Sequence, residues 1–544
     1  MTQHRALFGR PVDSVIECAS VRRSARTFQL HQRSRPSGRA LVGGHSTRRR
    51  QSSSSRRVVA VRVHDEQGSA RPDSESHDFR VFDASDEALP SFPSEQRLEY
   101  KRYLATEEVT VVATLIRHRW TSSFEGMSRR DRQGCDYDAY LPDPLAGWEL
   151  ALPADLVADL TDAEAAIRRL NTSTTTHVSL EGLARFLLRA ESVASSKIEG
   201  LEAGPRRLLD AEVVLAQGGD AADRVAVEVL ANVAAMEAAV ELGSTNDAIT
   251  LDDLLAIHRI LMERSSMPHI GGVVRTVQNW IGGSSYNPCS AAFVPPPPES
   301  LDDLLRDLLD YVNGDHHPAL VQAAIAHAQF ETIHPFADGN GRTGRALIHV
   351  ILRRRSLAPR FVPPISLVLA TWASDYIAGL TAFRHVGEPE SPERSTGAGS
   401  WLRTFATAAH RSCSDAEAYA ERIKMLDARW REQLDRVRAN SAVELLLDVL
   451  PGVPVITVES AARLIGRSEM RTGEAVNRLE AAGILRQRNV GRQRYRVFEA
   501  ADVIDLFTGL ERALASPTGD TATAPPNRRV PRRMKPTGDR TGSR

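Results

Sequence analysis

Residues 334–345 read HPFADGNGRTGR and concentrate the chemically useful side chains of this 544-residue chain. Gly339 and Gly341 permit backbone conformations that a Cβ would forbid, so successive N–H groups can converge on one anion at the start of a helix. Arg342 and Arg345 lie three positions apart, so both guanidinium groups can reach the same polyphosphate. The spacing therefore predicts a phosphate-binding site.

His334 and Asp338 supply the other groups that phosphate chemistry requires. A neutral imidazole, with an ordinary pKa of about 6.5, can accept a proton from an attacking hydroxyl. A carboxylate beside the phosphate site is a hard oxygen ligand of the kind that Mg²⁺ shares with substrate phosphates. The other histidines nearby do not match the spacing of a zinc ligand set, which disfavours a metallohydrolase. We therefore predict phosphoryl or nucleotidyl transfer.

The segment matches HxFx(D/E)GNGRxxR, the signature of the Fic family, at every defining position, so the chain resembles a Fic protein. Fic proteins transfer AMP from ATP to a Ser, Thr or Tyr hydroxyl of a protein. The resemblance implies that His334 is the catalytic base and that Asp338 binds Mg²⁺. It also implies a nucleotide site made of Asp338, Gly339, Asn340, Gly341, Arg342, Gly344 and Arg345, in which the two arginines hold the β and γ phosphates.

Residues 271–298 interrupt the helical period with paired glycines and a run of four prolines, and they resemble the flap of Fic proteins. A flap holds its target as an added strand, and an extended edge offers unpaired N–H and C=O groups to any peptide. The residues expected to contact the target are Arg275, Gln278, Asn279 and Trp280. The alternative is a connecting loop with a rigid polyproline spacer.

Residues 195–200, SSKIEG, resemble the inhibitory (S/T)xxxE(G/N) motif of Fic proteins. Ser195 and Glu199 are i and i+4 at the end of a predicted helix, so they share one face. The carboxylate can pair with a guanidinium of the phosphate site and fill the place of the γ-phosphate. The sequence therefore predicts autoinhibition by Glu199. The alternative is an exposed glutamate before a capping glycine.

Residues 458–497 read as helix, turn, helix and then a hairpin with a basic turn. This order resembles the winged helix-turn-helix of some bacterial Fic proteins. Winged helices bind DNA or dock on proteins, and the sequence leaves both roles open. The residues predicted to meet DNA are Arg471, Asn477, Arg488, Arg492 and Arg494.

Apolar residues at i, i+3 and i+4 predict the helices that must position these segments. The helices cover residues 154–170, 178–197, 222–242, 251–262, 301–311, 319–333, 340–354 and 401–438, with a break at 387–400. The predicted fold is mainly α. It consists of a Fic helical bundle with a β-hairpin flap, a small α+β winged-helix domain and disordered termini.

Composition changes along the chain predict five regions. They are a disordered Arg/Ser-rich segment at 1–126, an N-terminal helical region with the inhibitory helix at 127–245, the Fic catalytic core at 246–438, the winged helix-turn-helix at 439–515 and a disordered basic tail at 516–544. The first region has too few apolar residues to bury a core. An alternative is that translation starts at Met127 and that this region is not made.

Charge and cysteine content limit other functions. The chain has 69 Lys and Arg residues and 69 Asp and Glu residues, so its overall charge indicates neither a nucleic-acid partner nor a membrane surface. Its four cysteines form no CxxC pair, which favours neither a zinc knuckle nor a disulfide scaffold. No apolar run reaches the roughly 18 residues of a membrane span. The sequence therefore favours a protein of the reducing cytoplasm with no membrane partner.

The expected partners are ATP, a protein target along the flap, DNA through the winged helix, and a second copy in a homodimer. Two alternatives to AMP transfer stay open. One is a nucleotide-sensing transcriptional regulator that acts through the winged helix. The other is removal of AMP from a target, with Glu199 aligning a water molecule. The sequence does not name the target protein.

Overall fold

The computed structural model describes residues 58–62, 79–83, 112–122, 126, 128–172, 180–216, 219–245, 247–488 and 496–514. The chain divides into two units, and the larger one contains residues 112–514. In the smaller unit, the strands β1 (Val58–Arg62) and β2 (Phe79–Asp83) pair antiparallel. The tail predicted at 516–544 lies outside the described residues, and so does most of the segment predicted at 1–126.

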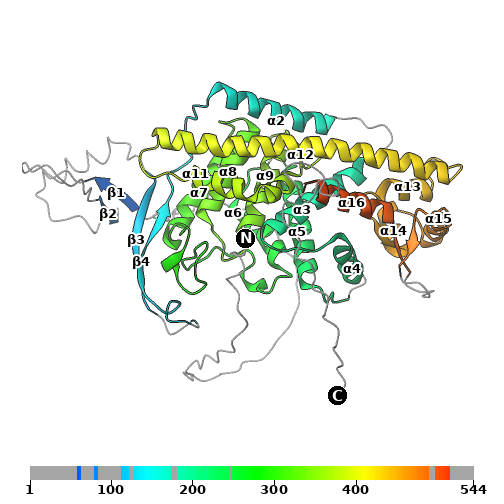
Figure 1. Ribbon diagram of the computed structural model, residues 1–544, viewed down its shortest axis with the longest axis horizontal. Helices are drawn as coiled ribbons and strands as arrows, with labels where there is room; N and C mark the ends of the chain where they lie inside the picture. The colour runs from blue at the N-terminus through cyan, green and yellow to red at the C-terminus, as the bar shows by residue number, and fades with distance from the viewer. Residues whose placement is uncertain are drawn as a thin grey trace, which may run out of the picture. The chain divides into compact units, whose positions relative to one another are not determined.

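Helices dominate the larger unit, which confirms the predicted mainly α fold (Figure 1). They are α2 (Ala154–Thr172), α3 (Leu180–Ile198), α4 (Pro205–Ala216), α5 (Arg224–Leu242), α6 (Leu251–Met262), α7 (Leu301–Asn313), α8 (Ala319–Ile333), α9 (Asn340–Arg354), α10 (Ile365–Thr371), α11 (Ala373–Phe383), α12 (Pro392–Gln433), α13 (Ala442–Val449), α14 (Val458–Ile465), α15 (Glu469–Ala481) and α16 (Ala501–Leu514). Three short 3-10 helices, η1 (Pro268–Ile270), η2 (Pro288–Ser290) and η3 (Pro298–Ser300), lie in and around the flap segment.

Helices α8 and α9 lie at the centre of the unit. All 15 residues of α8 are buried, as expected for a helix that is apolar on every side. One continuous apolar core runs from Leu145 to Ile423 and includes side chains of α2, α3 and α5 as well as α8 and α9. The N-terminal helices and the predicted catalytic core therefore share one interior. The loop between α8 and α9 is therefore anchored at both ends by buried helices.

Helix α12 begins at Pro392, earlier than the predicted start at residue 401. The Ser391 hydroxyl accepts the N–H of Arg394 as an N-cap, and proline at the first position needs no N–H partner. Gly397 allows close packing on α11, because a Cβ there would lie 1.9 Å from the carbonyl oxygen of Ala382. The predicted break through residue 400 is therefore wrong beyond residue 391. Helix α12 runs alongside α2 (Figure 1).

An antiparallel hairpin precedes the helices. It is formed by β3 (Thr114–Trp120) and β4 (Cys135–Leu141), with Trp120 opposite Cys135. Side chains of β3 alternate between half-buried and exposed, the pattern of a strand with one covered face. Residues 114–120 were predicted to be part of a disordered segment and instead form this strand, because pairing with β4 supplies contacts that composition does not reveal.

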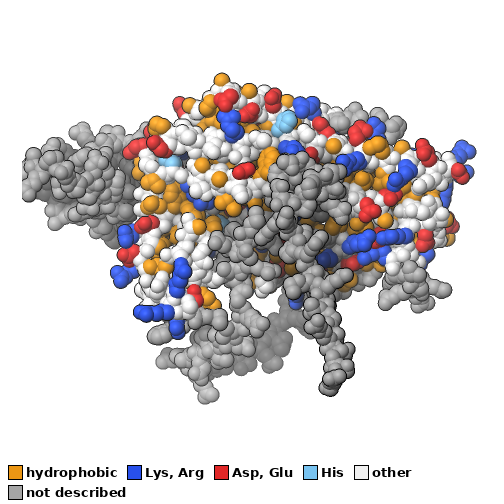
Figure 2. Space-filling view, viewed as in Figure 1, with side chains coloured by type: hydrophobic (Ala, Val, Ile, Leu, Met, Phe, Trp, Pro, Cys, Tyr) orange, Lys and Arg blue, Asp and Glu red, His pale blue; other side chains and the backbone are white. Residues whose placement is uncertain are grey.

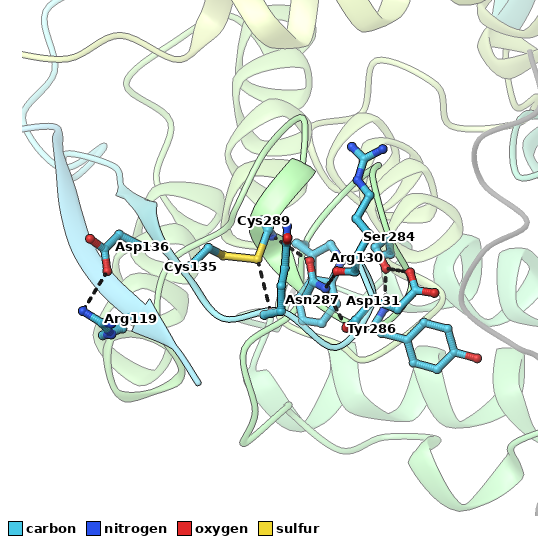
Figure 3. The surroundings of a disulfide bond; sticks show 11 residues. Arg119, Arg130, Asp131, Cys135, Asp136, Ser284, Tyr286, Asn287 and Cys289 are labelled. Atoms are coloured by element: carbon cyan, nitrogen blue, oxygen red, sulfur yellow. Dashed lines mark hydrogen bonds and ion pairs between the residues drawn. A yellow bond between two sulfur atoms is a disulfide. The ribbon is translucent and has the colours of Figure 1, made fainter. Parts of the chain in front are cut away.

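A disulfide joins Cys135 of β4 to Cys289 of the flap segment (Figure 3). The pairing was not predicted, because 154 residues separate the two cysteines and no local motif marks them. Disulfides are typical of oxidising compartments, so this bond weighs against the predicted cytoplasmic location. Cys413 is buried and unpaired with another cysteine.

The C-terminal module has its own small core, which includes Trp430 from the end of α12 and Phe498. Its strands β5 (Val455–Thr457), β6 (Arg486–Gln487) and β7 (Val497–Glu499) form an antiparallel sheet in the order β5-β7-β6. Helices α14 and α15 are joined by a turn at Gly466, whose φ of 61° is in the left-handed region. The module thus has the predicted order of helix, turn, helix and hairpin.

Among the described residues, no single helix has both the length and the apolar character needed to cross a membrane. Only α10 and α11 taken together meet that test, and they are bent by 100° relative to each other.

Candidate active site

The loop between α8 and α9 is shaped by three local features. His334 ends α8 in a left-handed conformation with φ 50°, and Gly339 turns the chain with φ 79° before α9 begins. The Asn340 side chain closes the loop: its Oδ1 accepts the N–H of Phe336 at 2.8 Å and its Nδ2 donates to the Phe336 carbonyl at 2.8 Å. The sequence predicts a phosphate contact for Asn340. In the structure, the side-chain amide of Asn340 closes the loop.

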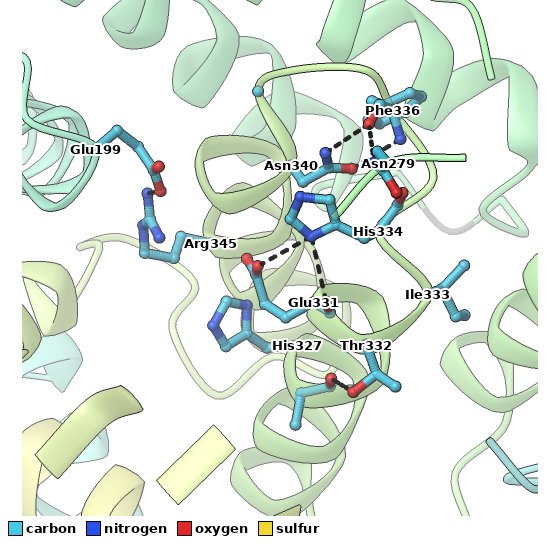
Figure 4. Close-up of polar contacts among 12 residues, drawn as sticks. Glu199, Asn279, His327, Glu331, Thr332, Ile333, His334, Phe336, Asn340 and Arg345 are labelled. Atoms are coloured by element: carbon cyan, nitrogen blue, oxygen red, sulfur yellow. Dashed lines mark hydrogen bonds and ion pairs between the residues drawn. The ribbon is translucent and has the colours of Figure 1, made fainter. Parts of the chain in front are cut away.

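His334 has the protonation state that a general base needs. Its Nδ1 lies 3.3 Å from the backbone carbonyl of Glu331, which can only accept, so we assign the ring proton to Nδ1 (Figure 4). Nε2 is then the basic nitrogen. Burial lowers the pKa of His334 to about 4, so the imidazole is neutral at physiological pH.

Arg342 has buried donors that could bind an anion. Its side chain is 4% exposed, and its nearest carboxylate is that of Asp338, 3.7 Å from Nη2. Its Nε and Nη1 are buried and have no hydrogen-bond partner in the part of the chain that the structure describes. Buried donors are nearly always paired in folded proteins, so these two point to a ligand such as a phosphate.

Asp338 is suited to bind a metal ion together with substrate phosphates rather than to hold one alone. Its carboxylate accepts the N–H of Gly339 at 2.7 Å and is 38% exposed. The described residues contain no group of three or more potential ligands that could hold a metal ion unaided. One carboxylate does fit Mg²⁺, because Mg²⁺ is commonly held by one or two carboxylates together with substrate phosphates.

Arg345 is buried and paired with the predicted inhibitory residues. Figure 4 shows it beside Glu199. Its Nη2 donates to Glu199 Oε1 at 2.8 Å, and its Nε donates to Ser195 Oγ at 2.9 Å. The carboxylate also lies directly over the loop glycine, because a Cβ on Gly341 would be 1.9 Å from Glu199 Oε1. The predicted pairing of Ser195 and Glu199 with the phosphate site is thus present. The Glu199 carboxylate occupies part of the space beside Gly341, where the sequence predicts a phosphate.

The flap is fastened to the catalytic loop by Arg275. Its backbone N–H donates to the Pro335 carbonyl at 2.9 Å, its Nε donates to the His334 carbonyl at 2.9 Å, and its Nη2 donates to the Pro296 carbonyl at 2.6 Å. The residue is 5% exposed. The predicted target contact is therefore corrected: Arg275 has no surface to offer a target and instead anchors the flap.

The other predicted flap residues also make contacts within the chain. Asn279 Nδ2 donates to the Phe336 carbonyl at 3.1 Å, and Gln278 Nε2 donates to the Pro295 carbonyl at 2.9 Å. The Trp280 ring N–H donates to the Ser284 carbonyl at 2.7 Å. The two arms of the flap meet at a single bridge between Ile281 and Phe293. The exposed large apolar side chains of this segment are Val273, Val277 and Tyr286.

His258 joins the flap to the catalytic loop, and sequence reasoning missed it. Its Nδ1 accepts the N–H of Gly272 at 3.0 Å, its Nε2 lies 2.9 Å from the Asp338 carbonyl, and its ring stacks on Phe336 at 3.7 Å. This pattern requires a neutral ring, and burial lowers the pKa of His258 to about 4. A histidine on the apolar face of a helix carries no sequence signal that separates it from an ordinary core residue.

Glu331 and Tyr376 were also missed. The Tyr376 hydroxyl lies 2.9 Å from Nε2 of His327 and 3.5 Å from Nη1 of Arg345, so it extends the buried polar network around the site. Glu331 lies beside His334 (Figure 4). A signal was available for it: a charged residue in a helix that has no polar face is expected to have a specific task.

The residues predicted to contact DNA lie in different surroundings. Arg471 and Asn477 are exposed on α15. Arg488 instead pairs with Glu499, with Nε 3.1 Å from Oε2. Arg492 and Arg494 lie outside the described residues. Figure 2 shows basic and acidic side chains interspersed on the visible face, rather than one continuous basic surface.

Comparisons with known proteins agree with this site. Residues 248–352 match the sequence model of the Fic/DOC family, and residues 157–241 match that of the Fic/DOC family N-terminal region. The loop and the flap lie inside the first match and Glu199 lies inside the second. The parts of the chain that build the site are therefore similar to Fic proteins.

Similar proteins cover only part of the chain. The protein adenylyltransferase fic-1 of Caenorhabditis elegans is 32% identical over 146 residues, which are 26% of this chain and 27% of that protein. The protein adenylyltransferase Fic of Culex quinquefasciatus is 38% identical over 122 residues, 22% of either chain. The chain thus spans about a quarter of the length of these relatives. A solved Fic family protein from Desulfovibrio desulfuricans aligns with a TM-score of 0.40 at 21% identity, over 64% of this chain and 97% of its own.

Proposed function

We propose that this chain is a protein adenylyltransferase that transfers AMP from ATP to a Ser, Thr or Tyr hydroxyl of a target protein. The observation that carries the proposal is the combination in one loop of a neutral His334 with the buried donors of Arg342, which have no hydrogen-bond partner among the residues that the structure describes. One group can take a proton and the other can hold a phosphate. The similarity of this loop to relatives named protein adenylyltransferases supports the same reaction.

In the proposed reaction, His334 Nε2 takes the proton of the target hydroxyl as the hydroxyl oxygen bonds to the α-phosphorus. The bond from that phosphorus to the pyrophosphate breaks, and pyrophosphate leaves with its charge held by Arg342 and Arg345. Asp338 would hold Mg²⁺, which when bound neutralises phosphate charge. The flap would present the target as an added strand beside the loop.

We further propose that Glu199 inhibits this reaction. Its pairing with Arg345 at 2.8 Å takes the guanidinium that the γ-phosphate needs. ATP bound beside Glu199 would then have its α-phosphate misaligned for attack.

The test uses ATP labelled at either the α or the γ phosphate, incubated with the purified Glu199→Gly variant and a cell lysate. Label from the α position alone, together with an adduct of AMP mass on a Ser, Thr or Tyr peptide, supports the proposal. Label from the γ position would indicate a kinase instead. Loss of label from a target modified beforehand would favour removal of AMP.

We infer that the predicted domain at residues 439–515 contains a winged helix-turn-helix. The support is the order of α14, a glycine turn, α15 and the β6–β7 hairpin, together with exposed Arg471 and Asn477 on α15. A gel-shift series at rising salt tests a DNA role, since phosphate contacts weaken steeply with salt. The absence of any shift at low salt would favour a protein-docking role.

A further inference from the structure

We propose that Glu331 is a positioning residue for His334, and that its buried carboxylate stabilises the positive charge that the imidazole acquires when it takes the hydroxyl proton. The inference rests on the proposed function, because it concerns the base of that reaction. It adds a residue outside the loop motif to the catalytic arrangement.

The geometry places Glu331 behind the ring. It belongs to the last turn of α8, three residues before His334, so both project from the same side of the helix. Its backbone carbonyl accepts the Nδ1 proton of His334 at 3.3 Å, and its Oε2 lies 4.0 Å from the same nitrogen (Figure 4). Both contacts are on Nδ1, so Nε2 stays available for the target hydroxyl.

The fold makes room for this carboxylate without giving it a hydrogen bond. The Glu331 side chain is 9% exposed. Its Oε1 is buried and has no hydrogen-bond partner among the described residues. It lies against Gly344, where a Cβ would be 2.9 Å from Oε1. A buried carboxylate without a partner is costly, so its presence indicates an electrostatic task in the site.

The charged and titratable groups around Glu331 come from every element packed against it. They are His327 and His334 of α8, Arg345 of α9, Tyr376 of α11, Arg384 just after α11, and Glu199 just after α3. Arg384 also packs its guanidinium over the Phe293 ring of the flap at 3.5 Å. The Glu331 carboxylate therefore lies among the base His334 and the arginines Arg345 and Arg384.

Glu331 gains its charge near neutral pH. Burial raises the pKa of Glu331 to about 7, although Arg345 and Arg384 oppose the shift. Burial lowers the pKa of His334 to about 4, so the base is already neutral across this range. A rise in pH through about 7 therefore changes the charge behind the base without changing the base itself. The rate of AMP transfer should increase over that interval.

The test compares Glu331→Gln with Glu331→Asp, each in the Glu199→Gly background. We expect Glu331→Gln to lower kcat by roughly ten- to a hundredfold, because a charge about 4 Å from the forming imidazolium is lost. The KM for ATP should change by less than about twofold, since no ATP contact is removed. The parent variant should show kcat rising between about pH 6 and pH 8, and Glu331→Gln should be flat. Glu331→Asp should keep part of the slope.

Asp143→Asn is the matched control. Asp143 is another buried carboxylate, its pKa is raised by burial to about 6, and its partner is Arg394 rather than the base. This control should retain the pH slope. An unchanged kcat and pH profile in Glu331→Gln would overturn the inference, as would a kcat loss matched by Asp143→Asn.

An NMR titration of the His334 imidazole separates this inference from the proposed function. The His334 ring signals should shift between about pH 6 and pH 8 as Glu331 ionises, and this shift should be absent in Glu331→Gln, whether or not the protein labels any target. If no variant labels and only the parent shows this shift, the pairing stands and adenylyl transfer fails. An identical titration in both proteins would overturn the pairing.

Discussion

The catalytic loop and the flap meet at His334, but they are held in different ways. The loop takes its shape from contacts within a few residues: Asn340 closes it on Phe336, and left-handed turns at His334 and Gly339 set its ends. The flap is held by contacts that reach far along the chain, such as Arg275 to the loop carbonyls and Cys289 to β4. The shape of the loop is thus set locally, whereas the position of the flap depends on distant parts of the chain.

This difference separates two kinds of experiment. Changes in the loop should alter the chemical step, because in the proposed reaction its side chains act on the target hydroxyl and the phosphates. Changes in the flap should alter the binding of the protein target and leave ATP binding intact. If loop variants change mainly kcat and flap variants change mainly the KM for the protein target, this division is supported. Variants of either region that change both constants would contradict it.

The largest effect is expected for His334→Ala. Loss of the general base should lower kcat by roughly a hundred- to ten-thousandfold, because proton removal from the hydroxyl then has no acceptor. ATP affinity, measured by calorimetry, should stay nearly the same. Undiminished labelling would remove His334 from the role of base.

A second large effect is expected for Asp338→Ala. No other carboxylate lies in residues 334–345, so the variant should lose Mg²⁺-dependent turnover by about two orders of magnitude. The measurement is labelling as a function of Mg²⁺ concentration. An unchanged Mg²⁺ dependence in the variant would show that the metal is held elsewhere.

A moderate effect is expected for Arg275→Met in the flap. The change leaves buried carbonyls of the loop and the polyproline arm without donors, which should loosen the flap and raise the KM for the protein target by roughly tenfold. Gln278→Met removes a single cross-flap hydrogen bond and serves as the milder control. An equal rise in the KM for ATP would contradict the division between flap and loop.

The smallest effect is expected from the disulfide. Unfolding the oxidised protein without reductant should expose two thiols rather than four, those of Cys18 and Cys413. Cys289→Ser should raise the KM for the target by less than about tenfold, because the hydrogen bonds of Arg275 and Asn279 still hold the flap. Four reactive thiols would show that the bond does not form.

The two regions also differ in what the sequence could predict. The position of the loop between two helices could be predicted, because the signals for the helix ends and for the glycine turns lie within one short segment. The contact of Glu199 with a guanidinium of the loop was expected from the resemblance of residues 195–200 to an inhibitory motif, and the structure contains that contact. The closure of the loop by Asn340 was not predicted. The burial of Arg275, the bridge through His258 and the Cys135–Cys289 bond were not predicted, because each depends on segments that only the folded chain brings together. Helix α12 was shortened in the prediction, because Gly397 signals a break in sequence but serves close packing in the structure.

One labelling experiment tests whether the pairing of Glu199 with Arg345 inhibits AMP transfer. A charge-assisted hydrogen bond contributes about 1.5 to 3 kcal/mol, and about 1.4 kcal/mol corresponds to a tenfold change in rate. Glu199→Gly should therefore label with α-labelled ATP roughly ten- to a hundredfold faster than wild type. Adding Arg345→Ala to Glu199→Gly should remove the gain, since the γ-phosphate then has no clamp. A Glu199→Gly variant that labels no faster than wild type would show that Glu199 does not inhibit the reaction. Glu199 would then be an ordinary surface residue or would take part in removal of AMP.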